Sequence, residues 1–132
     1  MSGASKFQIL IVDDEKVQRE MLEGFLVKQG YGAIAAEDGQ RALEKFKSGT
    51  FDLVLTDYRM PAMEGIQLLK EIKRLNPEAV VVIMTAYGTV GTAVTAMKAG
   101  AYDYLTKPID LDELLLLIQR VEREIGLGQE NR

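Results

Sequence analysis

The sequence of 132 residues contains neither cysteine nor histidine. Without cysteine there is no disulfide framework, thiol nucleophile or thiolate zinc site. Without histidine, Ser-His-Asp chemistry and imidazole acid–base catalysis are excluded, and so are nearly all protein zinc and copper sites. Chemistry is therefore left to carboxylates, ammonium groups, hydroxyls and phenols, and any bound metal would be a hard cation held by oxygen ligands.

Long hydrophobic runs and an excess of positive charge are also missing. The longest apolar run, Ala79 to Met84, has six residues, against the roughly 20 needed to cross a bilayer. The start lacks a secretory pattern, because the apolar stretch from Phe7 to Val12 is short and is followed by two aspartates. The formal net charge of −4 argues against direct binding of nucleic acid. We expect a soluble cytoplasmic domain that binds neither membranes nor nucleic acid.

What the sequence does contain is an alternation of apolar runs with amphipathic stretches. Five apolar runs predict strands at 7–12, 31–36, 51–56, 79–84 and 102–105. Most of them are apolar on both faces, as in a parallel sheet that helices cover on both sides. Helical apolar spacing fills the segments between them, and Gly30, Gly49 and Gly100 stand where the first, second and fourth helices should end.

Each helix is expected to bury one apolar stripe. In the first helix the stripe is Val17, Met21 and Phe25. In the fourth it is Val90, Ala93, Val94 and Met97, with Thr89, Thr92, Thr95 and Ala96 on the side that the core does not use. In the fifth, which opens at a predicted capping box of Asp110 and Glu113, the stripe is Leu111, Leu114, Leu115, Ile118, Val121 and Ile125. Leu116 and Leu117 fall outside that last stripe.

Repeated strand–helix units with right-handed crossovers predict one α/β domain, a doubly wound (βα)5 open sheet. We place this domain at residues 6–125, with an N-terminal extension at 1–5 and a polar, loop-like tail or the start of a linker at 126–132. In such sheets, ligands bind beyond the carboxyl ends of the strands.

Charged and hydroxyl side chains stand at those carboxyl ends. Asp13 and Asp14 follow the first strand, Asp57 the third, Thr85 the fourth and Lys107 the fifth. Carboxylates about 4–6 Å apart repel one another by a few kcal/mol per pair, so the group needs counter-charges. Lys107 supplies one, and an open site with few ligands favours Mg²⁺ as the other.

A carboxylate surrounded by Mg²⁺, an ammonium group and a hydroxyl suits phosphoryl transfer, in which the carboxylate is the nucleophile and forms an acyl phosphate. Asp57 is the best candidate because it stands alone on the middle strand, whereas the adjacent Asp13 and Asp14 suit a pair of metal ligands. Each aspartate could also be a helix cap or turn residue, and spacing alone does not decide which carboxylate is phosphorylated.

Four motifs, in this order, resemble those of the receiver domain of two-component response regulators. They are Asp13-Asp14-Glu15, the segment from Asp57 to Gly65, Met84-Thr85-Ala86, and the segment from Tyr104 to Pro108. The stretch 85–108 further resembles receivers of the NtrC-like class, which carry an ATPase and a DNA-binding domain downstream. The resemblance implies the flavodoxin-like receiver fold, with strand order 2-1-3-4-5.

The resemblance also implies roles for the matched residues. Asp57 is expected to accept a phosphoryl group from the phosphohistidine of a sensor histidine kinase. Asp14, Asp57 and the backbone carbonyl of Arg59 are expected to bind Mg²⁺, which Asp13 reaches through a water molecule. Lys107 is expected to contact a phosphoryl oxygen.

Other matched residues are implied to act in switching. Thr85 is expected to donate its hydroxyl to a phosphoryl oxygen, and Tyr104 to change rotamer with it. The peptide bond between Lys107 and Pro108 is expected to be cis. Arg59 and Tyr87 occupy the two positions that most affect the lifetime of the phosphate, and their bulk leads us to expect an acyl phosphate that persists for minutes or longer.

A partner surface is expected between the fourth helix, the fifth strand and the fifth helix. Its predicted members are small or apolar residues: Thr92, Thr95, Ala96, Leu116 and Leu117. The surface would support a phosphorylation-dependent homodimer or dock an output domain beyond Arg132.

Three alternative functions fit the sequence less well. An aspartate-based phosphatase of the haloacid dehalogenase type needs an acid two positions after its nucleophile, where this chain has Arg59. A flavodoxin-like cofactor carrier needs a phosphate-binding loop after the first strand, where Asp13 and Asp14 would repel phosphate. A purely structural interaction module would leave the charged strand ends unexplained.

Overall fold

The computed structural model describes residues 6–86 and 88–130, with side chains up to residue 126. Five strands alternate with five helices along the described chain. In order they are β1 (Gln8–Val12), α1 (Lys16–Lys28), β2 (Gly32–Ala36), α2 (Gly39–Ser48), β3 (Leu53–Asp57), α3 (Gly65–Leu75), β4 (Val81–Thr85), α4 (Val90–Lys98), β5 (Asp103–Thr106) and α5 (Leu111–Glu130). The predicted alternation is confirmed. The expected extension at 1–5 lies outside the described residues.

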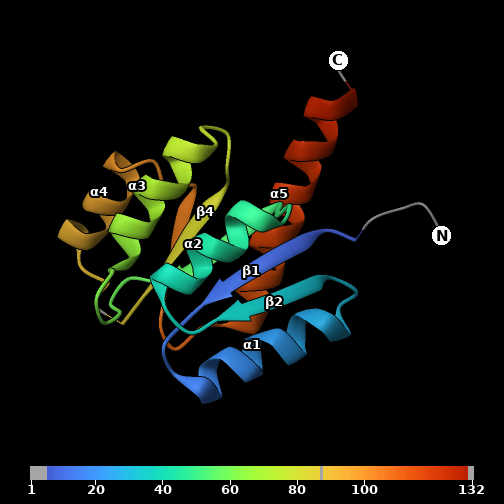
Figure 1. Ribbon diagram of the computed structural model, residues 1–132. Coiled ribbons are helices and arrows are strands. Elements are labelled where there is room, and N and C mark those ends of the chain that lie inside the picture. Colours follow the sequence, from blue (N-terminus) through green and yellow to red (C-terminus); the bar gives the residue numbers. More distant parts are fainter. Residues whose placement is uncertain (1–5, 87, 131–132) are drawn as a thin grey trace.

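The sheet is parallel throughout, with the strand order β2-β1-β3-β4-β5 that we expected (Figure 1). Every residue of β3 and β4 is buried. Their uninterrupted apolar runs therefore reflect strands with helices on both faces.

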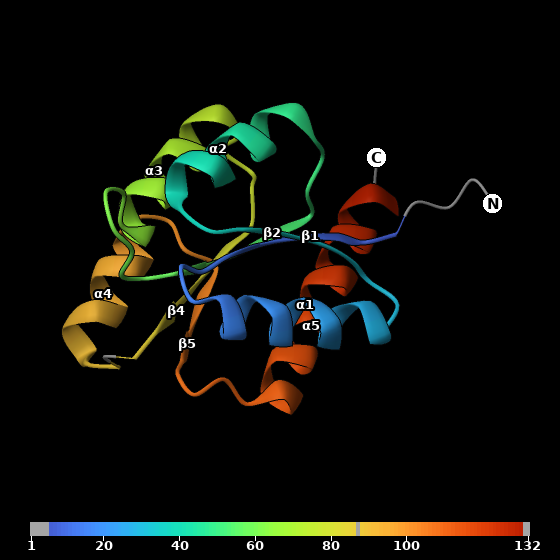
Figure 2. The same ribbon diagram turned by 60° about the horizontal axis from the view of Figure 1, so that its bottom comes forward.

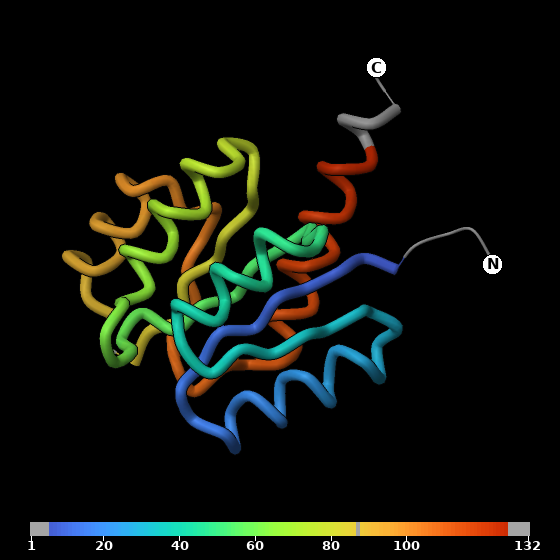
Figure 3. Tube along the Cα trace, in the orientation of Figure 1, coloured from blue at the N-terminus to red at the C-terminus, as the bar shows by residue number. Residues whose placement is uncertain are grey.

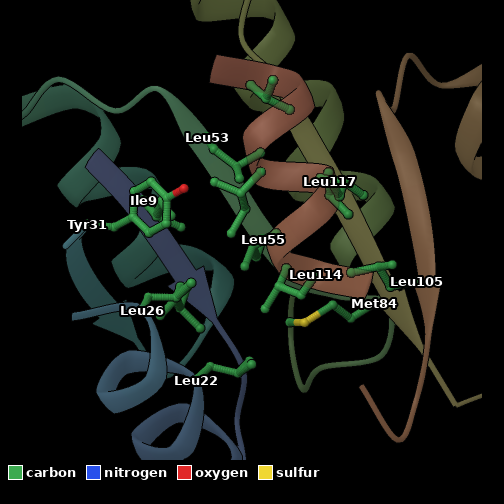
Figure 4. Packing of buried hydrophobic residues seen from close by; sticks show 14 residues of the cluster. Ile9, Leu22, Leu26, Tyr31, Leu53, Leu55, Met84, Leu105, Leu114 and Leu117 are labelled. Carbon is green, nitrogen blue, oxygen red and sulfur yellow. The ribbon is translucent and has the colours of Figure 1, made fainter. Parts of the chain in front are cut away.

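Two hydrophobic cores lie on opposite faces of the sheet. Figure 2 shows α1 and α5 on one face and α2, α3 and α4 on the other. The core under α1 and α5 includes Ile9, Leu22, Leu55, Met84 and Leu114, all with no exposed surface (Figure 4). The core on the other face is built largely from β1, β3, β4 and α3.

The first helix follows its predicted apolar stripe only in part. Leu22 and Leu26 are fully buried and Phe25 packs against the core, whereas Val17 is 82% exposed and Met21 39% exposed. The prediction is wrong for Val17 and Met21 because α1 carries apolar residues on more than one side, and spacing alone does not show which side meets the sheet.

The fourth helix also departs from its prediction. Its buried residue is Ala96, at 1% exposure, whereas Val90, Val94 and Met97 are 81%, 44% and 47% exposed. A small side chain at the contact lets the helix backbone approach the sheet closely, and the larger apolar residues are then left outside. The predicted stripe of α4 is therefore a largely exposed apolar surface.

The fifth helix follows its predicted stripe with one exception and is longer than expected. Leu117 is buried at 5% exposure, so it belongs to the core, while Leu116 is 67% exposed. The Asp110 carboxylate accepts hydrogen bonds from the N–H groups of Asp112 and Glu113, as a helix cap does.

The loop predicted from Gly126 onward is wrong for 126–130, because α5 continues to Glu130. Gly126 and Gly128 each cost the helix only about 1 kcal/mol relative to alanine. Two hydrogen bonds hold the preceding turn: Tyr31 donates to Glu122 and Tyr102 to Glu124, each at 2.7 Å. Among the described residues, no helix is both long and apolar enough to cross a membrane.

Candidate functional site

The predicted site residues meet at one end of the sheet. In Figure 3 the turns that follow β1, β3, β4 and β5 lie together at the lower left. Asp57 and Thr85 are the last residues of β3 and β4, while Asp13 and Lys107 directly follow β1 and β5. Parallel strands thus bring residues 94 positions apart into contact.

Three carboxylates form the centre of the site. Asp13 has no exposed surface, Asp57 is 8% exposed and Asp14 is exposed. Each offers one oxygen atom, and these three oxygens lie within 4.8 Å of one another. Oxygen ligands in this arrangement fit a hard divalent cation, and the open side at Asp14 leaves room for further ligands.

Asp13 is fixed by contacts to both of its carboxylate oxygens. Its Oδ1 accepts a hydrogen bond from the Glu15 N–H at 2.9 Å, and its Oδ2 accepts one from the Lys107 ammonium group at 2.9 Å. The Arg19 guanidinium donates to the Asp13 carbonyl, also at 2.9 Å. Arg19 was not among the predicted site residues. The only indication in the sequence is its position, one to two helical turns after Asp13 and Asp14.

Lys107 joins the two buried carboxylates. Its Nζ lies 2.9 Å from Asp13 and 3.3 Å from Asp57. Burial lowers the pKa of Lys107, but its hydrogen bond to Asp13 and the charge of Asp57 outweigh burial, so that its pKa is raised overall. Burial raises the pKa of the Asp57 carboxyl, an effect that Lys107 opposes and Asp13 increases. One ammonium group therefore balances two carboxylates only in part.

The remaining predicted residues surround this centre. Thr85 is buried at 2% exposure, and its carbonyl accepts the Lys107 N–H at 2.7 Å. Tyr104 is partly buried opposite Ile83 in the sheet. Arg59 is exposed, and its backbone N–H donates to the Asp57 carboxylate.

Two further expectations concern single positions. The peptide bond between Lys107 and Pro108 is cis, as expected. Tyr87, the second residue expected to affect phosphate lifetime, lies outside the described residues.

With three acids and one base, the four charged groups carry a formal charge of −2, which one divalent cation would neutralise. Asp57 is the carboxylate on the central strand that also faces the ammonium group. A carboxylate so placed can act as a nucleophile toward phosphorus, because the cations around it would stabilise the negative oxygens of the incoming group.

The family described as the response regulator receiver domain matches residues 9–119. The chain belongs to this family. A receiver is a phosphorylation-controlled switch, and this chain is accordingly a regulatory domain rather than an enzyme. The alternative of a haloacid dehalogenase-type phosphatase is not favoured.

Relatives of this receiver domain carry the names of transcriptional regulators. The chain is 50% identical over 129 residues to the transcriptional regulatory protein ZraR of Klebsiella oxytoca, which covers 98% of the chain and 29% of that relative. It is 48% identical to the regulatory protein AtoC of Escherichia coli, covering 95% of the chain and 27% of the relative. It is 43% identical to the DNA-binding transcriptional regulator NtrC of the same species, covering 85% and 24%. The chain thus spans less than a third of each.

Solved receiver structures share the fold along most of their length. A CheY-like receiver domain protein from Methanospirillum hungatei superposes with a TM-score of 0.87 at 30% identity, covering 94% of this chain and all of that one. The response regulator TrrA of Thermotoga maritima, solved in complex with Mg²⁺ and BeF, gives a TM-score of 0.79 at 36% identity, covering 86% and 97%.

Proposed function

We propose that Asp57 accepts a phosphoryl group from the phosphohistidine of a sensor histidine kinase in a Mg²⁺-dependent reaction. The observation that carries this proposal is the meeting of the Asp13, Asp14 and Asp57 oxygens within 4.8 Å, with the Lys107 ammonium 3.3 Å from Asp57. In the transfer, an Asp57 oxygen forms a bond to phosphorus while the phosphorus–nitrogen bond of the donor breaks. The bonding electron pair returns to the imidazole.

Two side chains of this receiver act on the transferred group. Lys107 brings a full positive charge to one phosphoryl oxygen, and it can turn from Asp57 toward that oxygen while it keeps its hydrogen bond to Asp13. Thr85, at the end of the neighbouring strand, offers a neutral hydrogen bond to another oxygen, worth about 1 kcal/mol. Lys107 thus serves both the transfer and the phosphorylated state, whereas Thr85 serves mainly the latter.

Asp14, Asp57 and the Arg59 backbone carbonyl would hold Mg²⁺, with Asp13 connected through water. The carboxylate oxygens within 4.8 Å of one another fit this assignment. The ion supplies positive charge that offsets the repulsion among the carboxylates and stabilises the transferring phosphoryl group. Asp13 is already held by Glu15 and Lys107, so its part is to fix Lys107 rather than to bind the ion directly.

The acyl phosphate is expected to hydrolyse slowly, over minutes or longer. Water must approach in line with the bond between Asp57 and phosphorus, and the exposed Arg59 side chain follows Asp57 by two positions. Arginine cannot act as a base near neutral pH. Substituting Arg59 by alanine should shorten the half-life of the phosphorylated protein, and a wild-type half-life of seconds would contradict this part of the proposal. Tyr87 is proposed to share this role.

Phosphorylation is proposed to change the surface formed by α4, β5 and α5, with Thr85 and Tyr104 moving together. A groove of about 430 Å³ lies along β5 and α5, and its lining includes Tyr104 and the exposed Leu116. Ala96, at 1% exposure, offers almost no contact area to a partner, whereas Leu117, at 5% exposure, lines the groove beside Leu116. The exposed large apolar residues of α4 and α5 are Val90, Val94, Met97 and Leu116.

The partners of this surface follow from the relatives. ZraR, AtoC and NtrC are several times longer than this chain, and their names support an output that regulates transcription, in NtrC through DNA binding. We propose that ATPase and DNA-binding domains supply this output, as the resemblance to NtrC-like receivers implies. Either those domains or a second receiver would bind the surface after phosphorylation, in the cytoplasm, where the kinase and the genes are accessible.

Labelling with acetyl phosphate in the presence of Mg²⁺ tests the proposal. Wild-type protein should gain one phosphoryl group, and Asp57→Asn should gain none. Asp38→Asn, which changes a helix-capping aspartate of α2, is the matched control and should be labelled like the wild type. If Asp57→Asn is labelled at the wild-type level, Asp57 is not the acceptor. In Asp14→Asn, which lacks a proposed ligand of the ion, adding Mg²⁺ should no longer increase labelling.

A further inference from the structure

The loop between β3 and α3 closes directly behind Asp57. Gly65, the first residue of α3, is buried, and its N–H donates to the Tyr58 carbonyl at 3.0 Å. A Cβ atom on Gly65 would overlap the Asp57 carbonyl oxygen, and it would stand 3.0 Å from the Asp57 carbonyl carbon and 3.1 Å from the Tyr58 Cα. These neighbours are backbone atoms, so they cannot turn aside as a flexible side chain could. Only glycine lets α3 begin this close to the phosphoacceptor.

The rest of the loop is also fixed. The Met63 N–H donates to the Pro61 carbonyl at 2.7 Å, which makes a tight three-residue turn with Ala62 at a φ of 68°. At the start of the loop, the Arg59 N–H donates to the Asp57 carboxylate. The Arg59 carbonyl therefore lies between the hydrogen bond of the Arg59 N–H and the tight turn at Ala62. Its position depends on how the loop closes.

We propose that Gly65 is a positioning residue for the Mg²⁺ site. By allowing the backbone of α3 to touch Asp57, it holds the Arg59 carbonyl and the Asp57 carboxylate in the arrangement that binds the ion. This inference rests on the proposed function, since it assigns the closure of the loop to the metal site used in phosphorylation. The ion binds the closed loop better than an open one, so that its binding must stabilise closure by the same factor.

The test compares two glycine-to-alanine substitutions. Gly65→Ala should weaken Mg²⁺ binding, measured by calorimetric titration, at least tenfold and slow labelling by acetyl phosphate, because the added methyl group pushes α3 and Asp57 apart. Gly24→Ala is the matched control, since a Cβ there meets nothing within 4 Å. That variant should bind Mg²⁺ within twofold of the wild type.

A second measurement uses the unaltered protein and does not depend on how well Gly65→Ala folds. Saturating Mg²⁺ should slow hydrogen exchange of the Gly65 amide at least fivefold, because that N–H forms the closing hydrogen bond. The Asn76 amide, which bonds to the Ile72 carbonyl at the far end of α3 at 2.8 Å, should be unaffected by the ion.

The outcomes separate the two ideas. Mg²⁺ binding by folded Gly65→Ala within twofold of the wild type would overturn the positioning role, and so would an unchanged Gly65 exchange rate in wild-type protein that binds the ion. Failure of the wild type to bind Mg²⁺ at all would overturn the metal site in the proposed function, and this inference with it.

Discussion

Helices α3 and α4 lie on the same face of the sheet, yet they are attached to it very differently. α3 buries Leu68, Leu69 and Ile72, all with no exposed surface. α4 buries Ala96, while its larger apolar residues, Val90 among them, are exposed. Burying a large aliphatic side chain contributes about 1.5–3 kcal/mol, whereas an alanine methyl group contributes less than 1 kcal/mol.

This difference teaches how one domain can be both a stable acceptor and a switch. α3 follows the loop after Asp57, so its firm packing keeps the proposed acceptor in place. α4 follows Thr85, where the phosphoryl group would be sensed, and its weak attachment lets it move at small cost. Segments with few buried apolar contacts are those that open most readily in native proteins.

The largest expected effect comes from breaking the α3 core. Ile72→Ala should lower the free energy of unfolding by about 2–5 kcal/mol, because it leaves a cavity under a fully buried side chain. The comparable truncation in α4, Ala96→Gly, should cost about 1 kcal/mol. Both values can be measured by guanidinium denaturation. Equal losses would show that α4 is held as firmly as α3.

The second prediction stiffens α4 instead. Gly91→Ala should stabilise the helix by about 1 kcal/mol, since a Cβ there meets only the Thr89 hydroxyl, at 3.7 Å. Amide exchange across residues 90–98 should slow, and exchange in α3 should not change. The response of α4 to beryllofluoride should also become smaller. A Gly91→Ala variant with unaltered α4 exchange would remove the link between this glycine and the looseness of the helix.

The third prediction concerns the exposed side of α4. Val94→Gln and Met97→Gln should change stability by no more than about 0.5 kcal/mol, as is usual for surface positions, because both side chains are more than 40% exposed. Together they should weaken any association that beryllofluoride and Mg²⁺ induce, measured by sedimentation velocity. Val17→Gln, on α1 at the other face of the sheet (Figure 2) and 82% exposed, serves as the control and should associate like the wild type.

The last prediction tests whether hydrogen bonds hold α5 in place in a way that α4 lacks. Tyr31→Phe removes the hydrogen bond to Glu122 and should cost about 1 kcal/mol near pH 7. Burial and the bond to Glu122 raise the pKa of Tyr31. The stability from this tyrosine is therefore present below the unfolded pKa of about 10 and is lost as the pH rises beyond it. The difference between wild type and variant should shrink from pH 7 to pH 10.5, and a constant difference would contradict this account.

The sheet and the centre of the site were predictable because each depends on one strong signal. The runs in β3 and β4 are apolar on both faces, which few other structures explain. Once the strands are parallel, Asp13, Asp57 and Lys107 must meet, since each stands at a carboxyl end.

The helix faces were less predictable, since apolar spacing reveals a stripe without showing what it meets. In α4 the residue that packs against the sheet is Ala96. The small size of its side chain, rather than its hydrophobicity, explains why this side of the helix is buried. Arg19 and Gly65 were not assigned structural roles for a related reason. Arg19 acts by donating a hydrogen bond to the Asp13 carbonyl, and Gly65 acts because it has no side chain. Neither role produces a pattern that a single sequence reveals.

The length of α5 has a mechanical consequence. The core contacts of the helix end at Ile125, which is partly buried, but the helix continues to Glu130, past the neighbouring strands in Figure 1. At about 1.5 Å per residue the portion after Ile125 is roughly 8 Å long, so that a tilt of about 10° around Ile125 moves the end of the helix by about 1 Å. The end of the helix thus acts as a short lever that turns about its last core contact. The hydrogen bonds of Glu122 and Glu124, just before that contact, set the direction in which the end of the helix points.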